Sequence, residues 1–245
     1  MRDLVYPPVI GFAKTAFKVL DVNFQLTGTE NVPRTGGAVI ALNHISYVDF
    51  VLGGFGALPS KRLVRFMAKE VLFRNRYAGP LMRGMHHIPV DRSAGAASYQ
   101  QAISYLAAGE VVGVFPEATI SRSFELKEFK SGTVRMAAEA AVPIIPMILW
   151  GTQRVLTKDH PRDFSRHRTI AISVGTPITV TAGDDATEAT AQLRSTMAGM
   201  LDRTIRAYPE QPAGAWWLPA SYGGSAPTPA EAERLDQEEL ARRAK

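Results

Sequence analysis

The fold is decided by a stretch of 13 residues, GAVIALNHISYVD, at positions 37–49. Its first six residues form a continuous apolar run, which is typical of a buried strand. The run ends at Asn43-His44, and we expect a helix from about Ser46 to Leu58. A buried strand that leads into a helix is the repeating unit of layered α/β folds.

The same alternation continues on both sides of this stretch. The predicted strands cover residues 24–27, 37–42, 63–68, 87–90, 111–115, 144–150 and 169–174. The predicted helices cover residues 9–20, 46–58, 94–108, 131–141 and 186–207, and residues 70–82 form a helix or a loop. Strands that alternate with helices of about 10–15 residues predict a single-domain α/β layered fold, with a largely parallel sheet flanked by helices.

We divide the chain into three parts. Residues 1–22 form an amphipathic helix for a membrane interface, residues 23–208 form the domain, and residues 209–245 form a C-terminal arm and solvated tail. The last part is rich in Pro, Gly and Ser and then in Glu, Arg and Ala, which predicts an extended arm followed by a short solvated helix or disorder. Trp216-Trp217 either contact a membrane or clamp the arm onto the domain.

The composition restricts the class of protein. The chain has 245 residues, 46% apolar and 21% charged, which suits a folded domain with a large core. The absence of cysteine excludes disulfides, thiolate metal sites and a cysteine nucleophile. The formal net charge of +5 favours phosphorylated molecules, an anionic bilayer or nucleic acid as partners. Because no nucleic-acid recognition motif accompanies this charge, no nucleic-acid partner is expected.

The predicted helix over Val9–Leu20 is amphipathic. Lys14 and Lys18 lie opposite an apolar half that includes Phe12 and Phe17. Such a helix either lies among anionic lipid headgroups or packs on the domain with its lysines in water. No apolar stretch is long enough to span a bilayer, so we expect a chain that lies on a membrane or in solution.

One loop at a strand end carries a candidate base. In parallel sheets, functional residues gather in the loops that follow the carboxyl ends of the strands. Here His44 lies at the end of a strand and Asp49 lies in the first turn of the next helix. The carboxylate can then bind one imidazole nitrogen and leave the other as a base. Alternatively, Ser46 or Asp49 only caps the helix, and His44 is an ordinary loop histidine.

A second loop, over residues 116–123, carries hydroxyl groups, a carboxylate and a cation. Glu117, Thr119 and Arg122 are the residue types that suit a phosphate or polyol substrate. A capped turn with a solvated arginine is the alternative.

Together the two loops resemble the glycerolipid acyltransferase family, typified by 1-acylglycerol-3-phosphate acyltransferases. The family block N-H-x-S-x-x-D matches residues 43–49, and an apolar strand ending in Asp-Arg resembles residues 88–92. The block F-P-E-G-T-R-S is similar to residues 115–121, and V-P-I-x-P matches residues 142–146. Residues 68–70 and 129–132 also look like family landmarks, and the resemblance runs from about residue 26 to 178.

The resemblance implies a glycerol-3-phosphate acyltransferase-like fold and an O-acyltransferase. The enzyme would move an acyl group from acyl-CoA or acyl carrier protein to 1-acylglycerol-3-phosphate, with His44 as general base and Asp49 as its partner. A model thiol has a pKa of about 8.5, so the thiolate can leave without a strong acid. No G-x-S-x-G elbow is present, and we expect no covalent intermediate, metal or resident cofactor.

The resemblance also gives supporting roles to neighbouring residues. Asn43, Ser46, Glu117 and Thr119 are expected to bind substrate or position the loops. Backbone N–H groups at the start of the helix that follows His44 are candidate oxyanion donors.

Two positions depart from the family pattern. Ala118 and Ile120 replace the Gly and Arg of the third block. If the family arginine holds the substrate phosphate, another cation must do so here; the candidates are Arg122 first, then Lys69, Arg92 and Lys130. The departures keep open another acceptor, such as glycerol-3-phosphate, another lysophospholipid or a glycolipid. A non-catalytic lipid-binding module is an alternative of another class, and the presence of both His44 and Asp49 argues against it. The expected partners are acyl-CoA, a lysolipid and an anionic membrane, at the cytoplasmic face of the cell membrane.

Overall fold

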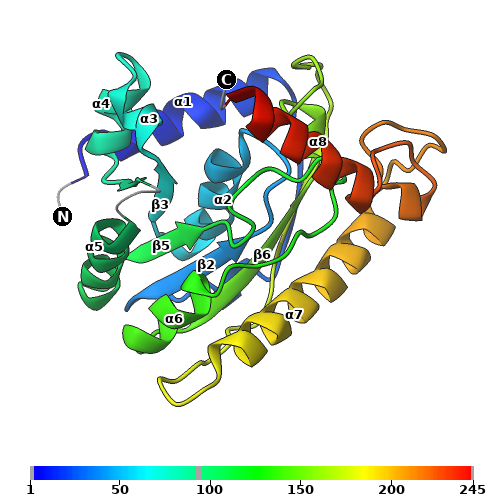
Figure 1. Ribbon diagram of the computed structural model, residues 1–245. Coiled ribbons are helices and arrows are strands. Elements are labelled where there is room, and N and C mark those ends of the chain that lie inside the picture. The colour runs from blue at the N-terminus through cyan, green and yellow to red at the C-terminus, as the bar shows by residue number, and fades with distance from the viewer. Residues whose placement is uncertain (1–2, 92–94, 244–245) are drawn as a thin grey trace.

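The computed structural model describes residues 3–91 and 95–243 (Figure 1). Its strands are β1 (Asn23–Thr27), β2 (Ala38–Leu42), β3 (Val64–Lys69), β4 (Ile88–Val90), β5 (Val111–Val114), β6 (Ile144–Trp150) and β7 (Thr169–Val174). Its α-helices are α1 (Tyr6–Val19), α2 (Asp49–Ala57), α3 (Glu70–Arg74), α4 (Ala78–Gly84), α5 (Gly95–Ala107), α6 (Gly132–Glu139), α7 (Ala186–Ala207) and α8 (Pro229–Arg243). Short 3-10 turns cover η1 (Thr29–Asn31), η2 (Leu58–Ser60), η3 (Thr152–Arg154) and η4 (Ala220–Tyr222).

Within these described residues, the strands form one seven-stranded sheet in the order β1-β7-β6-β2-β5-β3-β4. Neighbouring strands are parallel except for β6 and β7, which are antiparallel. Helices cover both faces of the sheet (Figure 1). The predicted fold class, an α/β domain with a largely parallel sheet flanked by helices, is confirmed.

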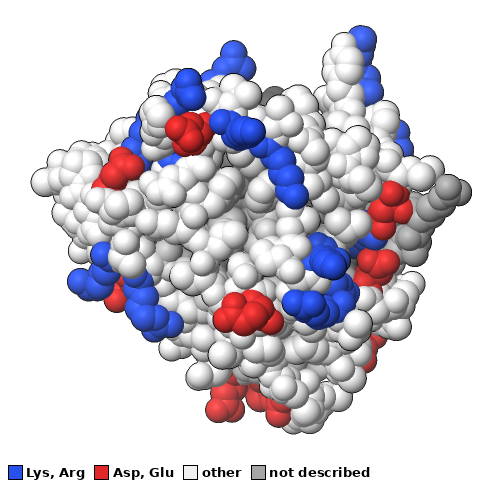
Figure 2. Space-filling view, turned by 180° about the vertical axis from the view of Figure 1, so that it is seen from behind, with Lys and Arg blue, Asp and Glu red and all other residues white. Residues whose placement is uncertain are grey.

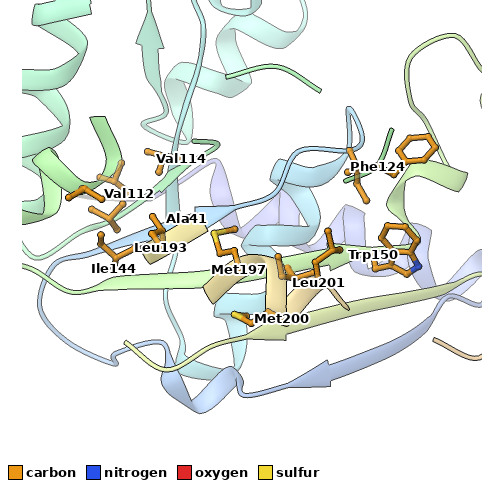
Figure 3. Packing of buried hydrophobic residues seen from close by; sticks show 14 of the residues in the cluster. Ala41, Val112, Val114, Phe124, Ile144, Trp150, Leu193, Met197, Met200 and Leu201 are labelled. Carbon is orange, nitrogen blue, oxygen red and sulfur yellow. The ribbon is translucent and has the colours of Figure 1, made fainter. Parts of the chain in front are cut away.

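Strand β2 shows how the sequence builds a core on each face of the sheet. All five of its residues are buried, and their side chains alternate between the two faces. Val39 and Ala41 pack with residues of α5, α6 and α7. Figure 3 shows Ala41 and Ile144 beside Leu193 and Met197 of α7. The β2 residues of opposite parity pack toward α1 and α2 on the other face.

Helix α1 lies on the domain through its apolar side. Phe17 makes edge-to-face contacts with Phe24 of β1 and Phe55 of α2, at centroid distances of 5.3 and 4.9 Å. The side chains of Phe12 and Val19 remain exposed. In the described part of the chain, no helix combines the length and apolar character needed to cross a bilayer.

Most boundaries agree with the sequence predictions. The strands over residues 144–150 and 169–174 and the helix over residues 186–207 occupy the predicted residues. Residues 70–82 form two short helices, α3 and α4, in place of one. Helix α2 begins at Asp49 rather than Ser46, because the Asp49 carboxylate binds the backbone N–H groups of Ile45 and Ser46 and holds that segment as a loop.

The C-terminal arm returns to the domain. The Trp216 ring stacks on His160 at a centroid distance of 3.9 Å. The Trp217 side chain is buried, with the Arg154 guanidinium 4.4 Å from its ring centroid. The structure therefore shows the second of the two predicted roles for the tryptophan pair: both rings hold the C-terminal arm on the domain. Beyond the arm, α8 lies across the loops that follow the sheet (Figure 1).

Candidate active site

The candidate site begins where β2 ends, and a side chain fixes this end. Asn43 is fully buried, and its amide nitrogen donates to the Leu149 carbonyl at 3.0 Å. Its amide oxygen accepts the Leu149 N–H at 2.7 Å. The side chain therefore extends the β2–β6 pairing by one rung while the backbone turns away. This contact makes Asn43 a loop-positioning residue.

The Asp49 carboxylate lies at the centre of the loop. Oδ2 is 3.0 Å from Nδ1 of His44, and it accepts the N–H groups of Ile45 and Ser46 at 2.7 Å each. Oδ1 accepts the hydroxyl of Thr152 at 2.6 Å. The carboxylate is fully buried, so these donors replace the water that it loses. The structure therefore brings the predicted His–Asp pair together.

The His44 ring lies against Phe115 and keeps a path to solvent. The two rings stack with a centroid distance of 4.1 Å and an interplanar angle of 24°. The His44 side chain is 21% exposed, whereas Asp49 is fully buried. Because Nδ1 faces the carboxylate, Nε2 is the nitrogen that can exchange a proton with a bound molecule. Fixed orientation on one nitrogen and access at the other are what a general base requires.

The expected oxyanion donors are not available at this helix start. The N–H groups of Ile45 and Ser46 bind Asp49, the Tyr47 N–H donates to Leu156 at 3.0 Å, and the Val48 N–H donates to the Ser46 hydroxyl at 3.2 Å. The prediction that they stabilise an oxyanion is therefore wrong. Ser46 in turn donates its hydroxyl to the Leu156 carbonyl at 2.6 Å and so positions the loop.

Glu117 joins the two candidate loops. Its Oε1 accepts the backbone N–H of His44 at 2.8 Å, and its Oε2 accepts the N–H of Lys127 at 3.0 Å. The Ser121 N–H also donates to the His44 carbonyl at 2.8 Å. Burial raises the pKa of Glu117 to about 8, against the opposite effect of the two N–H donors. Glu117 thus holds the His44 backbone in position through a hydrogen bond.

The remaining predicted residues of the second loop contact charged groups. The Lys127 ammonium donates to the Thr119 hydroxyl at 2.9 Å. Arg122 is buried and forms ion pairs with Asp159 and with Asp236 and Glu239 of α8. The alternative of a solvated arginine is therefore wrong, and carboxylates surround the first candidate for phosphate binding.

Two of the other predicted phosphate ligands are exposed. Lys69 is exposed at the carboxyl end of β3, two strands away from β2 in the sheet. Lys130 is exposed, and its backbone N–H donates to the Pro116 carbonyl at 2.9 Å. Arg92 lies outside the described residues.

Sequence reasoning missed Thr152, Lys127 and Lys158. Thr152 comes just after the buried strand β6 and contacts Asp49, so its place at another strand end was the available signal. Lys127 and Lys158 are ordinary surface residue types in sequence, and only the folded chain brings them beside Arg122. Across residues 3–91 and 95–243, no cluster of three or more His, Asp or Glu side chains is arranged to hold a metal ion.

Comparison with known proteins covers both loops of the site. A family model described as Acyltransferase matches residues 23–150. The 1-acyl-sn-glycerol-3-phosphate acyltransferase of Bacillus subtilis is 35% identical over 144 residues, which cover 57% of this chain and 70% of that protein. The protein of the same name from Borreliella burgdorferi is 28% identical over 150 residues, covering 60% of this chain and 58% of that protein.

The fold also has a solved counterpart. It is similar to the crystal structure of the 1-acyl-sn-glycerophosphate acyltransferase of Thermotoga maritima, with a TM-score of 0.69 at 20% identity, over 83% of this chain and 80% of that chain. Because the two sequences are only 20% identical, this similarity shows a shared fold. The family match extends over most of the sheet and includes His44, Asp49 and Glu117. The chain therefore belongs to the acyltransferase family.

Proposed function

We propose that this enzyme transfers an acyl group from acyl-CoA or acyl carrier protein to the free hydroxyl of 1-acylglycerol-3-phosphate, forming phosphatidic acid. One observation carries the proposal: in a member of the acyltransferase family, the half-buried His44 lies 3.0 Å from the buried Asp49 carboxylate. The names of the relatives from Bacillus subtilis and Borreliella burgdorferi support the choice of acceptor.

In the proposed mechanism, His44 acts as general base. Its Nε2 takes the proton of the acceptor hydroxyl while that oxygen attacks the thioester carbonyl. Nδ1–H donates to Asp49, whose negative charge stabilises the imidazolium that forms. When the tetrahedral intermediate collapses, the C–S bond breaks and an ester C–O bond remains. The thiolate leaves and takes up the proton held by His44, so no acyl-enzyme and no resident cofactor takes part.

We further propose that the protein works at the cytoplasmic face of the cell membrane, where it contacts anionic lipid. Exposed apolar side chains lie on two adjacent segments, residues 4–19 and residues 70–84: Leu4, Phe12, Val71, Leu72, Tyr77 and Leu81. The segments touch, because a Cβ atom on Gly84 would lie 2.5 Å from the Val5 side chain. Basic side chains of these segments accompany the patch, which suits an anionic headgroup layer: Lys14, Lys18, Arg74, Arg76 and Arg83.

Figure 2 shows the face opposite to that of Figure 1. A broad part of this surface is uncharged, and small groups of Lys and Arg side chains lie around it together with groups of Asp and Glu side chains. The projection at its upper right corresponds to the α3–α4 segment, which stands out at the upper left of Figure 1. An uncharged surface with cations near its border is compatible with contact to an anionic lipid layer.

The membrane proposal predicts weaker vesicle binding when the patch loses apolar surface. The double variant L72S/L81S should co-sediment less with vesicles of anionic phospholipid. Leu26→Ser is the matched control, since Leu26 is also exposed but lies on β1, at the opposite edge of the sheet. Equal binding of the double variant and the wild-type protein would refute a contact through α3–α4.

The proposed activity is tested by the release of thiol from palmitoyl-CoA. Release should depend on added 1-acylglycerol-3-phosphate and fall by about 10²–10⁴-fold in His44→Ala. His167→Ala is the control, because His167 is 73% exposed and pairs with Asp21 on the surface. Release that needs no acceptor would identify a thioesterase, and no release with any acceptor would refute the enzyme.

The replaced residues of the third block make an acceptor panel necessary. Ile120 is buried, so an apolar side chain packs where the family pattern has an arginine. This observation favours, as the second candidate, the same chemistry on glycerol-3-phosphate, another lysophospholipid or a glycolipid. A higher kcat/KM for one of these acceptors would replace 1-acylglycerol-3-phosphate in the proposal.

A further inference from the structure

Three cations next to the candidate active site share two carboxylates of helix α8. The Lys127 ammonium lies 2.5 Å from Asp236, and the Lys158 ammonium lies 3.1 Å from Asp236 and 3.0 Å from Glu239. Arg122 pairs with both carboxylates and reaches Glu239 at 2.8 Å. These three residues, Arg122, Lys127 and Lys158, are called the cation cluster below.

The cation cluster is attached directly to the His44 loop. Ser121, which precedes the arginine of the cluster, donates its N–H to the His44 carbonyl at 2.8 Å. Thr157, which precedes one of the lysines, donates its hydroxyl to the Ile45 carbonyl at 2.7 Å. Two of the three cations thus follow residues that are hydrogen-bonded to the backbone of His44 and Ile45. In 1-acylglycerol-3-phosphate, the reactive hydroxyl and the phosphate are on neighbouring carbons, so their binding groups must also be neighbours.

The charges supplied by α8 match those of a phosphate group. The cation cluster carries three positive charges, and Asp159 beside Arg122 carries one negative charge, which leaves a net charge of +2 without α8. Asp236 and Glu239 of α8 supply two negative charges through ion pairs, and Glu233 of the same helix acts electrostatically on Lys127. A phosphate monoester carries about −1.5 to −2 at neutral pH and offers three acceptor oxygens. Helix α8 therefore supplies what the phosphate of a substrate would supply.

Helix α8 is held mainly by these charges. Among residues 229–242, whose side chains the structure describes, only Ala232 is buried. Leu235 is half-buried and Leu240 is exposed, so few apolar contacts hold this helix. An element with few buried apolar contacts opens at a low free-energy cost. A competing anion can then replace its carboxylates without disturbing the core.

We propose that the cation cluster is the binding site for the phosphate of the acceptor, and that α8 is a built-in competitor that leaves when the acceptor binds. The inference rests on the proposed function for the identity of the ligand. In the resting chain, Asp236 and Glu239 neutralise the cluster. The incoming phosphate takes over the same cations, and the energy needed to detach α8 weakens the apparent affinity for the acceptor.

Adjacent glutamates provide a matched test in the full chain. Glu239 pairs with the cation cluster, whereas Glu238 is exposed on the same helix and contributes only its backbone carbonyl to a described hydrogen bond, from Arg242. The variants E239Q and E238Q change the charge of α8 equally. We expect E239Q and the double variant D236N/E239Q to lower the KM for 1-acylglycerol-3-phosphate, at least about fivefold in the double variant. The KM for palmitoyl-CoA and the kinetics of E238Q should remain at wild-type values.

The outcomes separate the proposal from its alternatives. A purely structural helix would lower the melting temperature of D236N/E239Q and leave the KM for the acceptor unchanged, which would overturn the inference. A fall in the KM for palmitoyl-CoA would place the 3′-phosphate of CoA in the cluster and overturn the assignment to the acceptor. If E238Q lowered the KM for the acceptor as much as E239Q, the effect would come from the net charge of α8, and the inference would be refuted.

A binding measurement tests the site without the reaction. In titration calorimetry, inorganic phosphate should bind D236N/E239Q at least about fivefold more tightly than the wild-type protein. Equal affinities would refute the competitor role even in an active enzyme. Tighter phosphate binding by the variant, in a protein that transfers no acyl group, would support the site and refute the proposed function. The experiments can therefore refute the competitor role of α8 and the proposed function independently of each other.

Discussion

Asp49→Asn separates the charge of the buried carboxylate from the position of its oxygen. Oδ2 faces the N–H groups of Ile45 and Ser46 at 2.7 Å each. An amide NH₂ in that place would face two donors, so the asparagine must place its carbonyl oxygen there. Its NH₂ group then faces Thr152, whose hydroxyl can accept as well as donate. His44 keeps an acceptor at Nδ1 and therefore keeps its tautomer.

The expected loss follows from the charge alone. With orientation retained, the variant loses only the negative charge that stabilises the imidazolium, so kcat/KM should fall by about 10–10²-fold. This corresponds to about 1.4–2.7 kcal/mol of transition-state stabilisation. His44→Ala removes the base itself and should cost about 10²–10⁴-fold. The stability loss should be about 1 kcal/mol for each of the hydrogen bonds that lose charge assistance, partly offset because a neutral amide is cheaper to bury.

The assay is acceptor-dependent thiol release from palmitoyl-CoA at low substrate concentration, with circular dichroism to verify the fold. A loss in Asp49→Asn as large as in His44→Ala, in a folded protein, would show that the tautomer was lost and contradict the argument from the two N–H donors. An unchanged kcat/KM would remove Asp49 from the mechanism.

Two further predictions concern stability. Asn43→Ala leaves the buried N–H and C=O of Leu149 without their partner, so the free energy of unfolding in urea should fall by about 2–6 kcal/mol, at about 1–3 kcal/mol for each group; a loss below 1 kcal/mol would contradict this role. Burial raises the pKa of Glu117 to about 8, so between about pH 5 and 8 the folded chain holds a proton that the unfolded chain has released. The stability from this group is complete below that window and is lost as the pH rises through it, by up to about 1.4 kcal/mol per pH unit. Urea unfolding of Glu117→Gln should lack this decline, and an identical decline in the variant would assign it to other groups.

The sequence predicted those features that depend on local pattern. Strand β6 is a continuous apolar run, helix α7 has apolar residues at helical spacing, and both lie at the predicted residues. The pairing of His44 with Asp49 could also be predicted from the sequence, because the two residues are only five positions apart. Periodicity and short spacing are properties that a sequence displays directly.

The features that sequence missed depend on contacts between distant residues. Arg122 was expected to meet a substrate phosphate, yet in this structure it meets carboxylates more than 100 residues away. A solvated tail was expected where α8 docks by charge, since no apolar pattern marks its contact face. Glu117 was expected to bind substrate or position the loops, and only the fold shows that it does the latter by accepting the His44 backbone N–H. Charge pairs between remote segments leave no periodic signal.

A buried guanidinium joins the start of the chain to the sheet. Arg65 of β3 pairs with Asp3 at 2.7 Å and with Glu110 at 3.2 Å, and the Tyr6 hydroxyl donates to the Val64 carbonyl at 2.6 Å. These contacts fix the start of helix α1 to strand β3, so α1 has a defined orientation relative to the sheet. If α1 rests on a surface, the sheet must keep a fixed orientation to that surface, and the position of His44 at the end of β2 is fixed with it.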